Sequence, residues 1–178
     1  MIETLRALMP HVAIESGPST DQPSIRIPVE ALAGVAQTLR DRPELAFVLL
    51  VDVTAVDWWP REPRFEVVYH LASMTQRLRM TVRLEGQNAR LPTLQSVWPA
   101  ACWLEREVWD MFGIVFEEHG DLRRLLMPED WEGHPLRKDF PVQIRLKPRY
   151  AEPLQVTEEE FRANLARDKA ARADAPGR

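Results

Sequence analysis

Apolar residues recur with two different periods along the first two thirds of the chain, and together they predict helices and strands. After Pro28, apolar positions follow the helical period from Val29 to Leu39, and Arg42-Pro43 ends this predicted helix. Residues 1–9 fit a second, shorter helix.

Strands are predicted in five places. Two short ones are expected at His11 to Glu15 and at Ser24 to Ile27, on either side of a turn-forming stretch. The aliphatic run Leu45 to Val53 predicts a strand buried on both faces, inside a sheet. Residues from Phe65 to Leu71 and from Leu78 to Leu84 alternate between apolar and polar types around a polar turn, which indicates an antiparallel hairpin.

The second half of the chain loses these periods. Pro92 and Pro99 are placed to open two short helices, the second running from Ala100 to Met111 and ended by Gly113. The fold class is therefore α+β, a mixed or antiparallel sheet with flanking helices followed by an extended, Pro-rich C-terminal arm. The predicted domains are an α+β domain (1–113), an extended arm docking on a partner subunit (114–156) and a charged tail or helix (157–178).

Composition excludes several classes of protein. The 178 residues suffice for one domain, and 45% hydrophobic with 28% charged residues is ordinary for a globular chain. The net charge of −4 argues against nucleic acid as a partner. The longest apolar run, Leu45 to Val51, is far shorter than the ~20 residues of a membrane span. One cysteine, Cys102, cannot form an internal disulfide or supply an iron–sulfur site alone.

Two clusters could carry chemistry. Glu105-Arg106-Glu107 and Asp110 lie on the predicted second helix, where Arg106 and Asp110 are four residues apart and can pair. A catalytic carboxylate pair is conceivable there, but no nucleophile or histidine stands nearby, and a structural or interfacial ion-pair role is favoured. His119 and His134, among aspartates, offer metal ligands at a spacing that matches no tight zinc pattern.

The predicted arm is locally basic. Arg123-Arg124 and Arg137-Lys138 are interleaved with Trp131 and Phe140, yet acidic residues are woven among them. Those acids would repel phosphate and suit docking against another protein. The chain has no Gly-rich dinucleotide loop, Walker loop or Cys-x-x-Cys pair, so it lacks a visible means of holding NAD, flavin or iron–sulfur.

Three segments carry a resemblance to a known family: Glu105-Arg-Glu-Val-Trp-Asp-Met-Phe-Gly-Ile114, His119-Gly-Asp-Leu-Arg-Arg-Leu-Leu-Met-Pro128 and Asp130-Trp-Glu-Gly-His-Pro-Leu-Arg-Lys-Asp-Phe-Pro141. They closely resemble the 30 kDa subunit, designated C, of the respiratory NADH-quinone oxidoreductase, complex I. The matching region spans roughly Trp98 to Pro141.

The resemblance implies a cofactor-free structural and assembly subunit in the peripheral arm of a proton-translocating NADH:quinone oxidoreductase, peripheral at the cytoplasmic face of the cell inner membrane. FMN and the iron–sulfur clusters would belong to partner subunits, and the complex, not this chain, would be the enzyme. The expected partners are other peripheral-arm subunits, especially the large quinone-site subunit, designated D. The resemblance assigns an assembly role to ten residues and no catalytic, cofactor or metal role to any; the ten are Glu105, Arg106, Glu107, Asp110, His119, Arg123, Arg124, Arg137, Lys138 and Asp139.

Two alternatives stay open. One is the equivalent subunit of a membrane-bound hydrogenase or of a quinone oxidoreductase with another electron donor. The other, from a different class, is a free-standing metal-dependent hydrolase that uses His119, His134 and the surrounding carboxylates.

Overall fold

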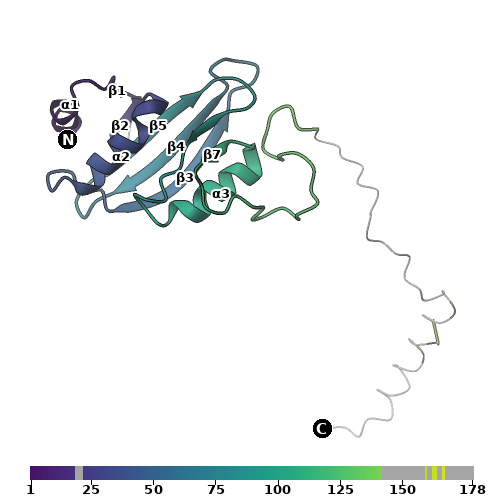
Figure 1. The fold of residues 1–178 in the computed structure, drawn as a ribbon. Coiled ribbons are helices and arrows are strands. Elements are labelled where there is room, and N and C mark those ends of the chain that lie inside the picture. Colours follow the sequence, from purple (N-terminus) through teal and green to yellow (C-terminus); the bar gives the residue numbers. More distant parts are fainter. Residues whose placement is uncertain (19–21, 142–158, 160–161, 164–165, 167–178) are drawn as a thin grey trace, which may run out of the picture. The chain divides into compact units, whose positions relative to one another are not determined.

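A five-stranded mixed sheet forms the centre of the computed structural model, which describes residues 1–18, 22–141, 159, 162–163 and 166 (Figure 1). Its order is β1-β2-β5-β4-β3, and only β2 and β5 run parallel. The strands are β1 (Glu15–Ser16), β2 (Ser24–Ile27), β3 (Leu49–Asp57), β4 (Phe65–Ala72) and β5 (Arg77–Leu84). The α+β class and the β4–β5 hairpin predicted from the sequence are confirmed.

One face of the sheet is the core face. Tyr69 in β4 lies opposite Val53 in β3 and Met80 in β5, and all three side chains are buried. Alternate residues of the same strands point to the other, outer face, where all but the buried Thr81 are partly or largely exposed. The alternation of apolar and polar residues in the sequence of β4 and β5 therefore indicates a sheet with one buried face.

In the described part of residues 1–141, three helices accompany the sheet: α1 (Ile2–Leu8), α2 (Leu32–Asp41), which follows the short 3₁₀ turn η1 (Val29–Ala31), and α3 (Ala101–Phe112). The buried apolar residues of α2 and α3 belong to the same hydrophobic core as the inward apolar residues of β3, β4 and β5. α3 ends where Gly113 adopts the left-handed conformation with φ of 73°, as predicted. A side chain at this position would also collide with the His134 ring.

Three expectations are corrected. The strand predicted inside the sheet and buried on both faces, Leu45 to Val53, is instead β3 at an edge of the sheet, with Leu49 and Val51 more than half exposed. No helix follows Pro92; residues 94–98 make only a turn. Pro92 ends β6 (Arg90–Pro92), which pairs in parallel with β7 (Val115–Glu117), and neither strand was predicted.

The first compact unit extends from Met1 to Phe140. Residues 114–140, placed in the arm by the sequence, thus fold onto the α+β unit, and the compact unit ends beyond the expected boundary at 113. Most of the arm after Pro141 and most of the tail from 157 to 178 lie outside the described residues. No helix in the described part of the chain is long and apolar enough to cross a membrane.

Candidate functional site

The charged motif on α3 is mostly buried. Glu105 and Asp110 are fully buried and Arg106 is nearly so, whereas Glu107 is exposed. Residues 105 and 106 point away from 107 because successive residues of a helix are about 100° apart. Burying three charged groups on one short helix is costly unless each is hydrogen-bonded, and the contacts of each one explain why the arrangement is stable.

Asp110 holds a turn of the following segment in place. Its Oδ2 accepts hydrogen bonds from the backbone N–H groups of Leu125, Leu126 and Met127 at 3.0, 2.8 and 2.9 Å, and its Oδ1 accepts one from Arg124 at 2.8 Å. Burial acts to raise the pKa of Asp110, but these bonds outweigh it and the pKa is lowered. The Arg106–Asp110 pair expected from the helical spacing does not form; Arg124 pairs with Asp110 instead.

Arg106 holds the start of the same turn. Its guanidinium donates to the carbonyl oxygens of Arg123 and Arg124, both at 2.8 Å, and lies over the ring of Trp103. Arg123 itself is exposed and pairs with Asp121 at 2.7 Å. Arg106 and Asp110 together therefore fasten residues 123–127 to α3.

Glu105 faces the opposite side of α3 and fastens the turn before the helix. Its carboxylate accepts a hydrogen bond from the Leu94 N–H at 2.7 Å and another from the Thr93 hydroxyl. Burial raises the pKa of Glu105 to about 7, against the lowering effect of the two hydrogen bonds. Burial, and then the Glu105 charge, also raise the pKa of Tyr69.

This raised pKa predicts that Glu105 makes the fold less stable as pH rises. A glutamate in the unfolded chain titrates near pH ~4.3, so between there and pH ~7 the native state holds a proton that the unfolded state has lost. The free energy of unfolding should fall by about 4 kcal/mol across that window because of this group. Glu105→Gln should remove the fall, measured by urea unfolding at pH 5 and pH 8. Glu107→Gln, exposed on the same helix, is the control, and parallel wild-type and Glu105→Gln profiles would contradict the prediction.

A second buried ion cluster joins the sheet to the segment after α3. Arg64 is 1% exposed and donates two hydrogen bonds to Asp57, at 3.0 and 2.9 Å, and two to Asp139, at 3.1 and 2.8 Å. The Lys138 N–H also donates to Asp57 at 2.9 Å. Burial acts to raise the pKa of Asp57, but the bonds from Arg64, Lys138 and Trp59 lower it to about 2.

Sequence reasoning missed Asp57 and Arg64. Asp57 is the last residue of β3, and Arg64 is the last residue of the Pro-containing loop that follows it. Arg64 hydrogen-bonds to Asp139, seventy-five positions later in the chain. The only available signal was an arginine directly before the strand that begins at Phe65, a position where an exposed charge is equally ordinary.

The remaining predicted residues lie along the segment 119–139. The His119 Nδ1 accepts from the Asp121 N–H, so its Nε2 carries the proton and donates to the Cys102 carbonyl at 3.1 Å. Arg137 donates to the Gln87 carbonyl and lies over the Phe65 ring. The Lys138 side chain is exposed, and its backbone alone contacts the cluster.

The histidines do not form a metal site. His134 Nδ1 bonds to the Asp110 carbonyl at 3.0 Å, and burial lowers the pKa of His134. Within the described residues no three His, Cys, Asp or Glu side chains gather as metal ligands. The hydrolase alternative therefore has no candidate metal centre in that part of the chain.

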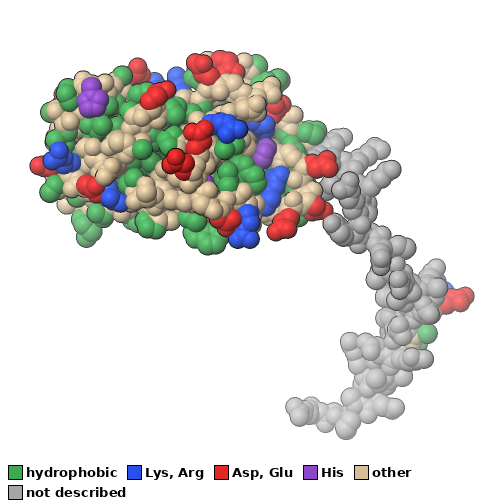
Figure 2. Space-filling model, viewed as in Figure 1, with side chains coloured by type: hydrophobic (Ala, Val, Ile, Leu, Met, Phe, Trp, Pro, Cys, Tyr) green, Lys and Arg blue, Asp and Glu red, His purple; other side chains and the backbone are tan. Residues whose placement is uncertain are grey.

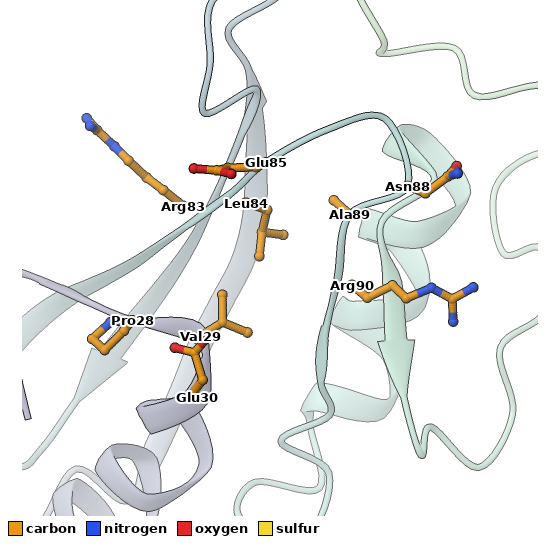
Figure 3. A pocket seen from close by; sticks show the side chains of 9 residues that line it. All are labelled: Pro28, Val29, Glu30, Arg83, Leu84, Glu85, Asn88, Ala89 and Arg90. Carbon is orange, nitrogen blue, oxygen red and sulfur yellow. The ribbon is translucent and has the colours of Figure 1, made fainter.

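A cavity of about 450 Å³ lies between the start of η1, the end of β5 and residues 88–90. Figure 3 shows that its two arginines, Arg83 and Arg90, extend away in opposite directions. The cavity thus brings no cluster of charged groups to one point and shares no residue with the motif on α3.

What the motif presents outward is apolar and mixed in charge. Trp103 and Leu126 are 58% and 60% exposed, and Glu107 and Arg123 are exposed as well. Trp103 and Glu107 share one side of α3, and Arg106 links Trp103 to the 123–124 carbonyls. We call Trp103, Glu107, Arg123 and Leu126 the α3 face. On the side of the molecule shown in Figure 2, acidic and basic side chains are intermixed with hydrophobic ones.

Comparison with known proteins identifies the family. Residues 25–145 match the family described as "Respiratory-chain NADH dehydrogenase, 30 Kd subunit". The chain belongs to this family. The matched range contains the whole motif on α3, the Arg64 cluster, the strands β3, β4 and β5, and all of β2 except Ser24.

Relatives agree with this family over most of the chain. It is 47% identical over 144 residues to the NADH-quinone oxidoreductase subunit designated C of Roseiflexus sp. (strain RS-1), covering 80% of this chain and 83% of the relative. It is 44% identical over 161 residues to the subunit of the same name from Rhodobacter capsulatus, covering 85% of this chain and 80% of that one. As a 30 kDa-family chain it is a subunit of an oxidoreductase complex.

Two solved structures are similar. A trypsin-resistant fragment (1-134) of Nqo5 is 32% identical with a TM-score of 0.53, covering 67% of this chain and 95% of the fragment. A chain from a membrane-bound sulfane sulfur reductase, an archaeal respiratory membrane complex, is 26% identical with a TM-score of 0.67, covering 88% of this chain and 93% of that one.

Proposed function

We propose that this chain is a cofactor-free structural and assembly subunit in the peripheral arm of a proton-translocating NADH:quinone oxidoreductase. It supports electron transfer from NADH through FMN and iron–sulfur clusters that other subunits hold, and it takes no part in the chemistry itself. Its principal partner is the large quinone-site subunit, and it associates with the cytoplasmic face of the inner membrane only through the complex.

The proposal rests on the hydrogen bonds that the charged residues of the family motif make. Glu105, Arg106 and Asp110 each hydrogen-bond to backbone groups or side chains of this chain, so none of them is left to face a substrate. Their effect is to fix two turns against α3 and so to hold the α3 face rigid. A rigid apolar patch with an aromatic anchor and a charged rim is typical of a protein interface.

The remaining assembly residues fit the same role. Arg123 and Lys138 are exposed and can meet charges on a partner, while Arg124, Arg137, His119 and Asp139 order the segment that carries them. Docking of residues beyond Pro141 on a partner subunit is part of the same proposal.

Purification of the tagged chain from its own host in mild detergent tests this function. Mass spectrometry of the co-purified proteins, a visible spectrum for flavin and iron–sulfur, and NADH:quinone activity should together identify the complex. Leu126→Lys should lower recovery of the complex several-fold, because a buried unpaired ammonium weakens an interface. Met74→Lys is the matched control, since Met74 is 94% exposed on the turn between β4 and β5. Recovery of the chain alone would overturn the proposal.

A second candidate rests on the similarity to the sulfane sulfur reductase chain. That structure belongs to a respiratory membrane complex whose name contains neither NADH nor quinone. The equivalent role in a hydrogenase or another-donor complex predicts a different set of companion subunits, which the same mass spectrum would report.

A further inference from the structure

Exposed apolar side chains concentrate along β3, at one edge of the sheet. Of the ten large hydrophobic residues exposed in the described part of the chain, six fall within residues 48–59. We call these six the β3 strip: Val48, Leu49, Val51, Val56, Trp58 and Trp59. Single exposed apolar residues are ordinary, but a run of them along one strand marks an interaction surface.

The backbone of β3 is available as well. β3 pairs with β4 on one side, and within the described residues no strand lies along its other side. Natural edge strands are usually short or carry lysine or proline, which prevents pairing with another chain. β3 is nine residues long and has neither; the features that interrupt its edge are the bulge at Val51 and the exposed charge of Asp52.

The outer face of the sheet continues the strip. A groove of about 300 Å³ crosses this face, and its β3 side is lined by Thr54, Val56 and Trp58. The rest of its lining comes from the other strands and the turn before β2: Glu66, Val68, His70, Arg79, Thr81, Ser24 and Pro18. A strand added to the β3 edge would place its outward side chains alongside this groove. The edge of β3 therefore offers backbone hydrogen-bonding groups, and the outer face of the sheet offers apolar surface. Addition of a strand from another chain depends on both.

The charge on this segment of the chain indicates which kind of strand could pair with the β3 edge. The strip segment 48–59 contains two charged residues, of which Asp57 is buried against Arg64. Asp52 is exposed, and in the described residues it has neither an ion pair nor a side-chain hydrogen bond. A second copy paired through the same edge would add another carboxylate with no cation between them. A partner strand with Lys or Arg opposite Asp52 would neutralise it.

We propose that the free edge of β3 receives an extended strand from a partner subunit, and that this strand is a segment of apolar residues with a basic side chain opposite Asp52. This inference rests on the proposed function, because it needs a complex to supply the strand. It adds a second docking surface, built from β3 and separate in sequence from the α3 face.

A photo-reactive phenylalanine analogue placed at Val51 tests the occupant in the intact complex. Val51 is 55% exposed and the strand bulges there, so the substitution needs no space in the core. The expected result is a covalent adduct to a segment of another subunit that contains a Lys or Arg. An adduct to a second copy or to this chain's own residues, or no adduct at all, would overturn the inference.

Substitutions test the energetics. Leu49→Lys combined with Asp52→Lys should lower the amount of chain retained in the complex at least about tenfold, since both place cations in an apolar interface that already holds one. Asp52→Asn should lower it less, and Met74→Lys not at all. Melting temperatures of the purified chains separate a folding defect from a docking defect. If the double variant does not fold, the cross-linked adduct at Val51 alone tests whether a partner strand lies on β3.

The two proposals fail in different ways. If wild-type chain purifies with a complex but the double variant is retained equally well, the strand inference is wrong and the proposed function stands. If wild-type chain purifies with no partner, both are wrong.

Discussion

Asp110→Ala should lower the free energy of unfolding by about 4 kcal/mol or more, a large part of the 5–15 kcal/mol that stabilises a typical domain. The substitution removes the acceptor for three part-buried backbone N–H groups and for the Arg124 side chain, which is 13% exposed. Each donor left without a partner costs ~1–3 kcal/mol, and the loss of the Arg124 ion pair adds to this cost. Urea unfolding of the purified chain would measure the loss.

The same substitution should have a local signature. Residues 124–127 are held to α3 by Asp110, so trypsin should cut at Arg123 or Arg124 in the variant under conditions that leave the wild type whole. Glu107→Ala, exposed on the same helix, should change stability by less than ~0.5 kcal/mol. A loss of that small size for Asp110→Ala would show that the 124–127 turn holds its shape without the carboxylate.

Local patterns were sufficient to predict most regular elements. The β4–β5 hairpin and the helix after Pro28 follow periods of two and 3.6, which depend only on which face is buried. β6 and β7 span three residues each, too few to display a period, and their pairing joins positions twenty-five apart. These strands form because residues 90–92 and 115–117, which flank α3 in the sequence, pair with each other in the folded chain.

The error at β3 has a different cause. An aliphatic run is equally compatible with a strand buried on both faces and with an edge strand whose apolar side chains meet something outside the chain. Leu49 and Val51 look like core residues in the sequence and are more than half exposed in the structure. This difference between sequence and structure is informative, because an exposed surface with the apolar composition of a core usually contacts a partner.

The motif residues show where sequence reasoning reaches its limit. Residue type and the family resemblance were enough to single out Glu105, Arg106 and Asp110. They could not show which group each of these residues binds. The partners of Asp110 are fourteen to seventeen positions away, in a segment with no period. Whether the exposed Glu107, Arg123 and Lys138 dock on another subunit stays a prediction.

Arg64→Met should be nearly as damaging as the loss of Asp110, because it leaves the buried Asp57 carboxylate without its cation. Removing one partner of a buried pair typically costs ~3–5 kcal/mol. Asp139→Asn should cost no more than about 1 kcal/mol, because the Asp139 side chain is 37% exposed and water can replace Arg64 there. Thermal and urea unfolding of the two variants beside wild type would measure both values.

The acid dependence gives an independent check on the Arg64 cluster. The pKa of Asp57 is lowered to about 2 in the folded chain, below the ~3.9 of an unfolded aspartate, so the unfolded state binds the proton first as pH falls. The stability that Asp57 contributes is therefore complete above pH ~4 and is lost between there and pH 2. In Arg64→Met the main group that lowers this pKa is gone, while burial, which raises it, remains. The variant should bind a proton in the native state at a higher pH than wild type, and its stability should rise rather than fall on mild acidification. If acid lowered the stability of variant and wild type equally, Arg64 would not be the group that keeps Asp57 ionised.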